Sequence, residues 1–181
     1  WGQGGGKGFM AEILCSYTMY RLMLLTNPFR YFNIDRTSFF DILNISFVGG
    51  DQAKAVFFDH MKNVIRETKN PDNGKRWFEE RGVDLRDNGI GDIKEMIIKL
   101  PRNIRARCLP FTKVSWEGSS IILGIIDEPS RAVSSPPANL RGKRIFSGML
   151  DNTTGRFQRK GKVVTFSYPE AQDDDLIMKL W

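Results

Sequence analysis

Apolar residues occur along this chain in short runs and in longer periodic segments, which predict strands and helices in alternation. The run Ile121–Ile126 is apolar throughout, as expected for a central strand of a parallel sheet buried on both faces. Other runs rich in β-branched or alternating apolar residues predict further strands. Together the predicted strands cover residues 42–48, 95–100, 103–109, 121–126 and 162–167.

Longer segments between these strands predict helices. Residues 10–25 lack Gly and Pro and predict a largely buried helix that ends at Thr26-Asn27-Pro28. Asp51 can cap a second helix through about residue 66, whose apolar positions recur at helical spacing. The remaining predictions are a polar excursion with a short helix at 69–92, a loop at 129–137 and a helix at 140–153. The alternation of strands and helices predicts an α/β sheet.

Glycines crowd the start of the chain, in the segment Gly2-Gln3-Gly4-Gly5-Gly6-Lys7-Gly8, immediately before the first predicted helix. Glycines let successive backbone N–H groups surround a phosphate, and the lysine reaches the β- and γ-phosphates. Two positions depart from the phosphate-loop pattern: Trp1 replaces a glycine, and Gly8 replaces the hydroxyl residue that holds Mg²⁺. By itself the segment supports a phosphate-binding loop and a frayed terminus equally.

Two adjacent acids, Asp127 and Glu128, follow the buried strand. Ligands of open α/β sheets bind at the carboxyl ends of the strands. Asp127 would hold Mg²⁺ directly or through water, and Glu128 would orient and deprotonate a water that attacks the γ-phosphate. The alternative is a solvent-facing pair that merely ends a strand. Together with the glycine-rich loop, the pair favours nucleotide chemistry.

The order of these motifs resembles that of a known family. The loop Gly2–Lys7, the segment 43–58 with Gln52-Ala53-Lys54, the sequence Ile125-Ile126-Asp127-Glu128-Pro129 and the strand 162–169 follow one another as in the ATPase domain of the tailed-phage terminase large subunit. The resemblance implies a P-loop NTPase of the additional-strand catalytic-glutamate class, with a mainly parallel sheet and helices on both faces. It also implies ATP and Mg²⁺ as ligands.

The resemblance assigns roles to matching positions. Lys7 and Glu128 would be catalytic, Asp127 would lie beside the metal, and Ser167 would couple hydrolysis to movement. The nucleotide-binding residues would be Gly2, Gln3, Gly4, Gly5, Gly6, Lys7 and Gly8. Many members carry an arginine where Gln3 stands, so the arginine that neutralises the transition state would be Arg156 or come from a neighbouring subunit.

The resemblance further implies what surrounds the domain. Residues 1–181 would form one ATPase domain, a fragment without the strand before the loop and without a C-terminal nuclease. It would work as an oligomer in the host cytoplasm, not in a membrane, and package double-stranded DNA with a portal protein and a small terminase subunit. A helicase-like translocase and a nucleotide- or DNA-binding module that does not hydrolyse are the rival hypotheses. The preference between ATP and GTP stays open.

Composition changes this picture little. Lys and Arg number 27 against 21 Asp and Glu, and the net charge of +6 favours a polyanionic partner. Cys15, Cys108 and His60 lack the spacing of a disulfide framework or a zinc site, which favours a reducing compartment. The acidic triplet 173–175 is interpreted as a solvated turn. Two basic groups are equally compatible with a phosphate-contacting stripe and a solvated face: Arg102, Arg105 and Arg107, and Arg156, Arg159, Lys160 and Lys162.

Overall fold

The computed structural model of the chain describes residues 6–46, 58–86, 91–92, 97–110, 118–127 and 136–166. Within these residues, six strands form one sheet in the order β2-β3-β4-β1-β5-β6. Four neighbours, β4, β1, β5 and β6, are parallel, while β2 and β3 add an antiparallel edge. The strands are β1 (Phe40–Ser46), β2 (Gly91–Asp92), β3 (Ile97–Leu100), β4 (Ile104–Pro110), β5 (Ile121–Asp127) and β6 (Lys162–Phe166).

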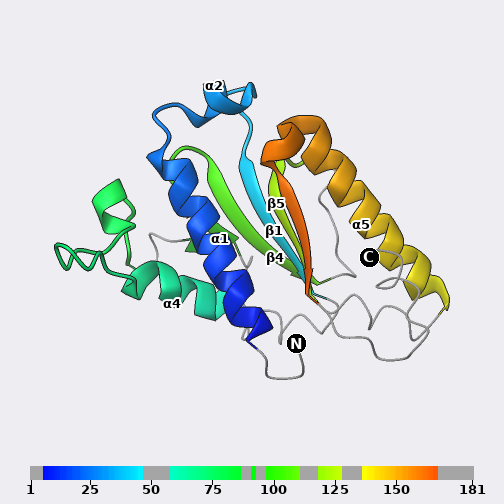
Figure 1. The fold of residues 1–181 in the computed structure, drawn as a ribbon, viewed down its shortest axis with the longest axis horizontal. Helices are drawn as coiled ribbons and strands as arrows, with labels where there is room; N and C mark the ends of the chain where they lie inside the picture. Colours follow the sequence, from blue (N-terminus) through cyan, green and yellow to red (C-terminus); the bar gives the residue numbers. More distant parts are fainter. Residues whose placement is uncertain are drawn as a thin grey trace.

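Helices cover both faces of the sheet (Figure 1). The helix α1 (Lys7–Leu24) packs with α4 (Asp59–Glu67) over one face, while α5 (Pro136–Phe157) covers the other. The short elements are α2 (Pro28–Phe32) and two 3-10 turns, η2 (Glu79–Arg81) and η5 (Gln158–Lys160). The predicted α/β architecture, mainly parallel with helices on both faces, is therefore confirmed.

The strand β5 is the centre of the fold. All six residues from Ile121 to Ile126 are buried, and β5 pairs in parallel with β1 on one side and β6 on the other. Gly124 faces α5 so closely that an added Cβ atom would lie 2.3 Å from Cε of Met149. The absence of a side chain at Gly124 therefore lets α5 pack directly on β5.

The helix α1 differs from the prediction of a largely buried helix. One stripe, including Cys15, Met19 and Leu22, faces the core, and each of these residues is at most 2% exposed. On the opposite stripe, Phe9 and Tyr17 are 60% and 54% exposed. The apolar run is long enough to suggest burial all round, but only the residues at helical spacing along one face reach the sheet.

Other boundaries are close to those predicted. The strand pair β3–β4 and the short turn of η2 are confirmed, whereas α5 begins at Pro136, inside the predicted loop. Proline is compatible with the first turn of a helix, where its missing N–H has no partner to lose. The unpredicted α2 is capped by Asn27, whose Oδ1 accepts a 3.0 Å hydrogen bond from the Arg30 backbone N–H. The predicted segment 47–57, with its Asp51 cap, lies outside the described residues.

Candidate functional site

The four parallel strands end at one edge of the sheet, where α1 also begins (Figure 1). One register level holds Ser46 of β1, Asp127 of β5 and Phe166 of β6, with Pro110 of β4 beside Ser46. Lys7 is the first residue of α1. The structure therefore brings the start of α1 and the acidic end of β5 to the same edge of the sheet.

The start of α1 has the backbone of a loop that turns sharply into a helix. Gly6 adopts φ 77° and ψ 14°, in the left-handed region that favours glycine, and its carbonyl accepts a 3.0 Å hydrogen bond from the N–H of Met10. Gly6, the residue before the helix, provides no side chain to cap the first turn of α1. The backbone N–H groups of that first turn can therefore donate hydrogen bonds to an anion. Gly8 follows in the first turn, whereas Gly2, Gln3, Gly4 and Gly5 lie outside the described residues.

Asp127 lies on the face of the sheet that α1 covers. Its alternation with Ile125, which belongs to the core beneath α1, places the carboxylate there, partly exposed at the strand end. The neighbouring Ser46 is buried. A carboxylate and a hydroxyl are the hard oxygen donors that suit Mg²⁺. The donor chemistry at this edge thus fits the ion that a nucleotide would bring.

Behind Asp127, a polar layer continues between the sheet and α1. Asn44 Nδ2 lies 3.6 Å from Cys108 Sγ and donates to it, and both residues are buried. Burial raises the pKa of Cys108 to about 12, an effect that the hydrogen bond from Asn44 opposes and the nearby charge of Asp127 reinforces. Burial also raises the pKa of Cys15 on α1, with smaller contributions from Cys108 and Glu12. Both thiols are therefore protonated and poorly nucleophilic at neutral pH.

Glu12 is a polar residue of this region that the sequence motifs did not assign. It is 3% exposed, and its Oε1 lies 3.6 Å from Nδ1 of the largely exposed His60 on α4. Burial raises the pKa of Glu12, and the charge of His60 partly opposes the increase. The signal for Glu12 in the sequence was that it interrupts the apolar run before residue 25. An acid on a packed helix face is uncommon, so such an interruption points to a special environment.

Glu12 should make the folded state less stable as the pH rises. Its pKa is higher in the folded chain than in the unfolded chain, so its favourable contribution is full below the unfolded value, near 4.5, and is lost as the pH rises through the folded value. We expect Glu12→Gln to be more stable than the parent at pH 7 and to lose this advantage at pH 4. Urea unfolding at the two pH values measures the difference. Glu67→Gln, at an exposed site, is the control for the loss of one charge.

Arg156 lies away from the Asp127 edge. Its Nη1 donates a 2.9 Å hydrogen bond to Oγ of Ser120, which directly precedes β5. At about 3.3 Å per residue, the seven-residue β5 separates Ser120 from its far end by roughly 20 Å. The structure does not bring Arg156 and Asp127 together within one chain. The other predicted residues, Glu128 and Ser167, lie outside the described residues, as does the acidic triplet 173–175.

The arginines of β4 form neither an open stripe nor a solvated face. Arg105 donates from Nε and Nη2 to the two oxygens of buried Asp41, at 2.6 and 2.9 Å. Arg107 Nε lies 3.5 Å from the same carboxylate, and its Nη2 donates to Ser119 Oγ at 2.6 Å. Burial lowers the pKa of Arg107, and the positive charge of Arg105 lowers it further, whereas the negative charge of Asp41 raises it. This network joins β1, β4 and the residues before β5, beside a cavity of about 420 Å³.

Among the described residues, no three His, Cys, Asp or Glu side chains gather closely enough to hold a metal ion by themselves. A site at the Asp127 edge would therefore use nucleotide phosphates and water as further ligands, as Mg²⁺ commonly does. In the same part of the chain, none of the helices has the length and apolar character required to span a bilayer.

Comparison with known families adds one finding. A family model described as "Uncharacterized protein MJ0330, N-terminal P-loop domain" matches residues 1–181. Neither a curated protein nor a solved structure matches the chain. The match includes the glycine-rich start and extends through the whole sheet. It supports a P-loop domain and does not point to a phage terminase, so it narrows the terminase resemblance to the P-loop fold.

Proposed function

This chain belongs to the family of the N-terminal P-loop domain of MJ0330, and from that premise we propose that it binds and hydrolyses a nucleoside triphosphate. A P-loop domain suggests nucleotide binding, and the proposal extends this to hydrolysis. One observation carries it: Gly6, in the left-handed conformation, leads into Lys7, the first residue of α1, at the sheet edge where β5 ends in Asp127. Binding would place the triphosphate against the first turn of α1.

The chain's own residues would divide the work. Lys7 would neutralise the β- and γ-phosphates, and the amides of the segment from Gly2 to Gly8 would surround them. Asp127 would hold Mg²⁺ beside Ser46, and the ion would neutralise charge on the phosphates. Glu128, the next residue in the sequence, would orient and deprotonate the attacking water.

A narrower proposal is that hydrolysis drives movement along double-stranded DNA, as in a packaging motor. The order of the sequence motifs, with Ser167 as the coupling residue, and the net charge of +6 support it. Because Arg156 lies at the amino end of β5, it would act on the nucleotide of a neighbouring subunit. Turnover of ATP and of GTP, each with and without duplex DNA, tests this proposal, and turnover that DNA does not change would count against the motor.

A module that binds without hydrolysing is the second candidate. Gly8 supplies no hydroxyl to the ion, and Gln3 supplies no charge to the transition state. Under this alternative, nucleotide binding survives and turnover is absent from the parent protein in every condition. The same turnover measurement therefore separates the two candidates.

Lys7→Ala should weaken nucleotide binding by at least tenfold without changing the fold. Lys7 is only partly buried at the start of α1, and it is not part of the hydrophobic core. Removing one charge-assisted contact to phosphate costs on the order of 1.5–3 kcal/mol. Titration with a fluorescent ATP analogue gives the affinity, and circular dichroism checks the fold.

The matched control is Lys75→Ala, which removes an equally charged but exposed side chain outside the predicted phosphate loop. It should bind nucleotide as the parent does. Equal affinity of Lys7→Ala and the parent would refute the assignment of the phosphate site.

A further inference from the structure

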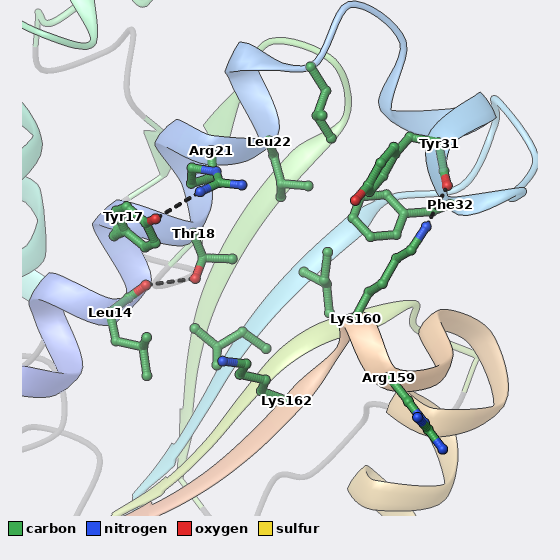
Figure 2. Close-up of a pocket in the computed structure, with 13 residues that line it drawn as sticks. Leu14, Tyr17, Thr18, Arg21, Leu22, Tyr31, Phe32, Arg159, Lys160 and Lys162 are labelled. Carbon is green, nitrogen blue, oxygen red and sulfur yellow. Dashed lines mark hydrogen bonds between the residues drawn. The ribbon is translucent and has the colours of Figure 1, made fainter.

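A second concave site lies far from the start of α1, between the carboxyl half of this helix and the segment that leads into β6. Its cavity measures about 410 Å³. Tyr17 and Arg21 of α1 form one wall, Tyr31 and Phe32 of α2 another, and Lys160 and Lys162 the third (Figure 2). We call this site the basic groove. Ile122 and Leu123 of β5 contribute an apolar floor.

The basic groove is charged with one sign. Its lining includes Arg21, Arg159, Lys160 and Lys162, and none of the described lining residues is acidic. All four are exposed. Figure 2 shows Lys162 extending from β6 toward α1 and Lys160 extending toward Tyr31 and Phe32. Several cations around one cavity, with no acid among its described lining residues, favour a ligand with several negative charges.

Aromatic rings lie beside two of these cations. Tyr17 and Tyr31 are 54% and 53% exposed although both rings are large. Arg21 Nη1 donates to the hydroxyl of Tyr17 at 2.9 Å. Lys160 Nζ lies 3.9 Å from the centroid of Tyr31 and donates to the Tyr31 carbonyl at 3.2 Å. Each exposed ring thus lies beside a cation, and the Lys160 ammonium covers one face of the Tyr31 ring, which leaves Tyr17 as the better stacking surface.

Phosphates and planar groups occur together in nucleic acids. Proteins bind single strands by combining a cationic groove for the backbone with aromatic rings on which bases stack. A duplex keeps its bases stacked on one another and offers no free base face to Tyr17 or Tyr31. A concave site with an apolar floor and exposed rings therefore fits an unpaired strand better than a duplex.

The basic groove is separate from the proposed nucleotide site. Arg21 follows Lys7 by 14 residues in the same helix, which corresponds to about 21 Å along the axis. Lys162 pairs with Leu123 near the start of β5, toward the opposite edge of the sheet from Asp127. A ligand in the groove is therefore not the triphosphate held by Lys7.

We propose that the basic groove binds a short segment of single-stranded nucleic acid, with Lys160 and Lys162 on its phosphates and Tyr17 stacked on one of its bases. This proposal goes beyond the nucleotide-binding function and does not depend on it.

Fluorescence anisotropy with labelled oligothymidylate and oligouridylate of about 12 nucleotides tests the proposal. Lys160→Gln/Lys162→Gln should weaken binding by roughly tenfold or more and reduce the slope of log affinity against log salt by about 0.7 for each lost phosphate contact. Lys75→Gln/Lys99→Gln makes the same change of charge at exposed lysines that do not line the groove, and should bind as the parent does.

The ring contribution has its own matched pair. Tyr17→Leu should weaken oligonucleotide binding by roughly fivefold or more, while Tyr17→Phe, which keeps the ring, should restore most of the affinity. Each variant should bind the fluorescent ATP analogue as the parent does, which separates a failure at the groove from a failure at Lys7.

Three results would overturn the proposal. Equal losses in the two lysine pairs would show that only net charge matters. A duplex that binds as tightly as the single strands, together with no effect of Tyr17→Leu, would assign the surface to duplex DNA. Displacement of the oligonucleotide by inorganic phosphate at constant ionic strength would assign the groove to a small phosphorylated ligand.

Discussion

Replacing Glu128 with glutamine is expected to slow nucleotide hydrolysis by about two to four orders of magnitude, the range for losing a positioned general base. The substitution keeps the size of the side chain and one hydrogen-bond acceptor but removes the carboxylate that accepts the proton. Affinity for the nucleotide should stay at the parental value, because binding relies on the loop and Lys7. Steady-state turnover and equilibrium titration of the same preparation measure the two quantities.

Asp127→Asn is the matched comparison, because it makes the same type of change at the adjacent position. Asp127 lies at the register level of Ser46 on the face covered by α1. Its loss should weaken binding of the nucleotide in the presence of Mg²⁺ as well as turnover. Parental turnover by Glu128→Gln would show that another residue accepts the proton from the attacking water.

Asp41→Ala should destabilise the fold more than any other single change considered. Asp41 is fully buried, and its carboxylate is the counter-charge of both Arg105 and Arg107. Removing one partner of a buried ion pair typically costs 3–5 kcal/mol, and the partial exposure of Arg105 favours the lower end, about 3 kcal/mol. For a chain of this size the unfolding temperature should fall by roughly 6–12 °C.

The chain contains a suitable control for that experiment. Asp84 and Arg86 form an exposed pair with a 2.6 Å contact between Oδ2 and Nη2, and hydrogen bonds from Arg86 lower the pKa of Asp84 to about 2. Solvent screens this pair, so Asp84→Ala should leave the unfolding temperature nearly unchanged. A similar fall in unfolding temperature in both variants would mean that burial does not determine how much the Asp41 network stabilises the fold.

The parts of the fold that the sequence predicted are those with a local signal. The strand β5 is apolar at every position because both of its faces are covered, and this is visible without knowing its neighbours. The end of α1 follows from Asn27 and Pro28, which disfavour continuation of a helix. The pairing of β3 with β4 likewise follows from a short connection between two apolar runs.

The parts that could not be predicted depend on partners far away in the chain. Arg105 and Arg107 are compatible with several roles until β1 places Asp41 beside them. The basic groove requires residues of α1 and β6 that are more than a hundred positions apart. Glu12 interrupts an apolar run in the sequence, but only the packing of α1 against α4 shows that it is buried beside His60.

The contact between Gly124 and Met149 has a consequence for the spacing of the layers. A Cβ atom at position 124 would overlap the terminal methyl group of Met149, which is itself fully buried. Because the overlap involves only the far end of a flexible side chain, a larger residue at position 124 would require Met149 to adopt another rotamer before α5 would have to move away from β5. The side-chain size at position 124 and the rotamer of Met149 are thus linked, although the two residues are distant in the sequence.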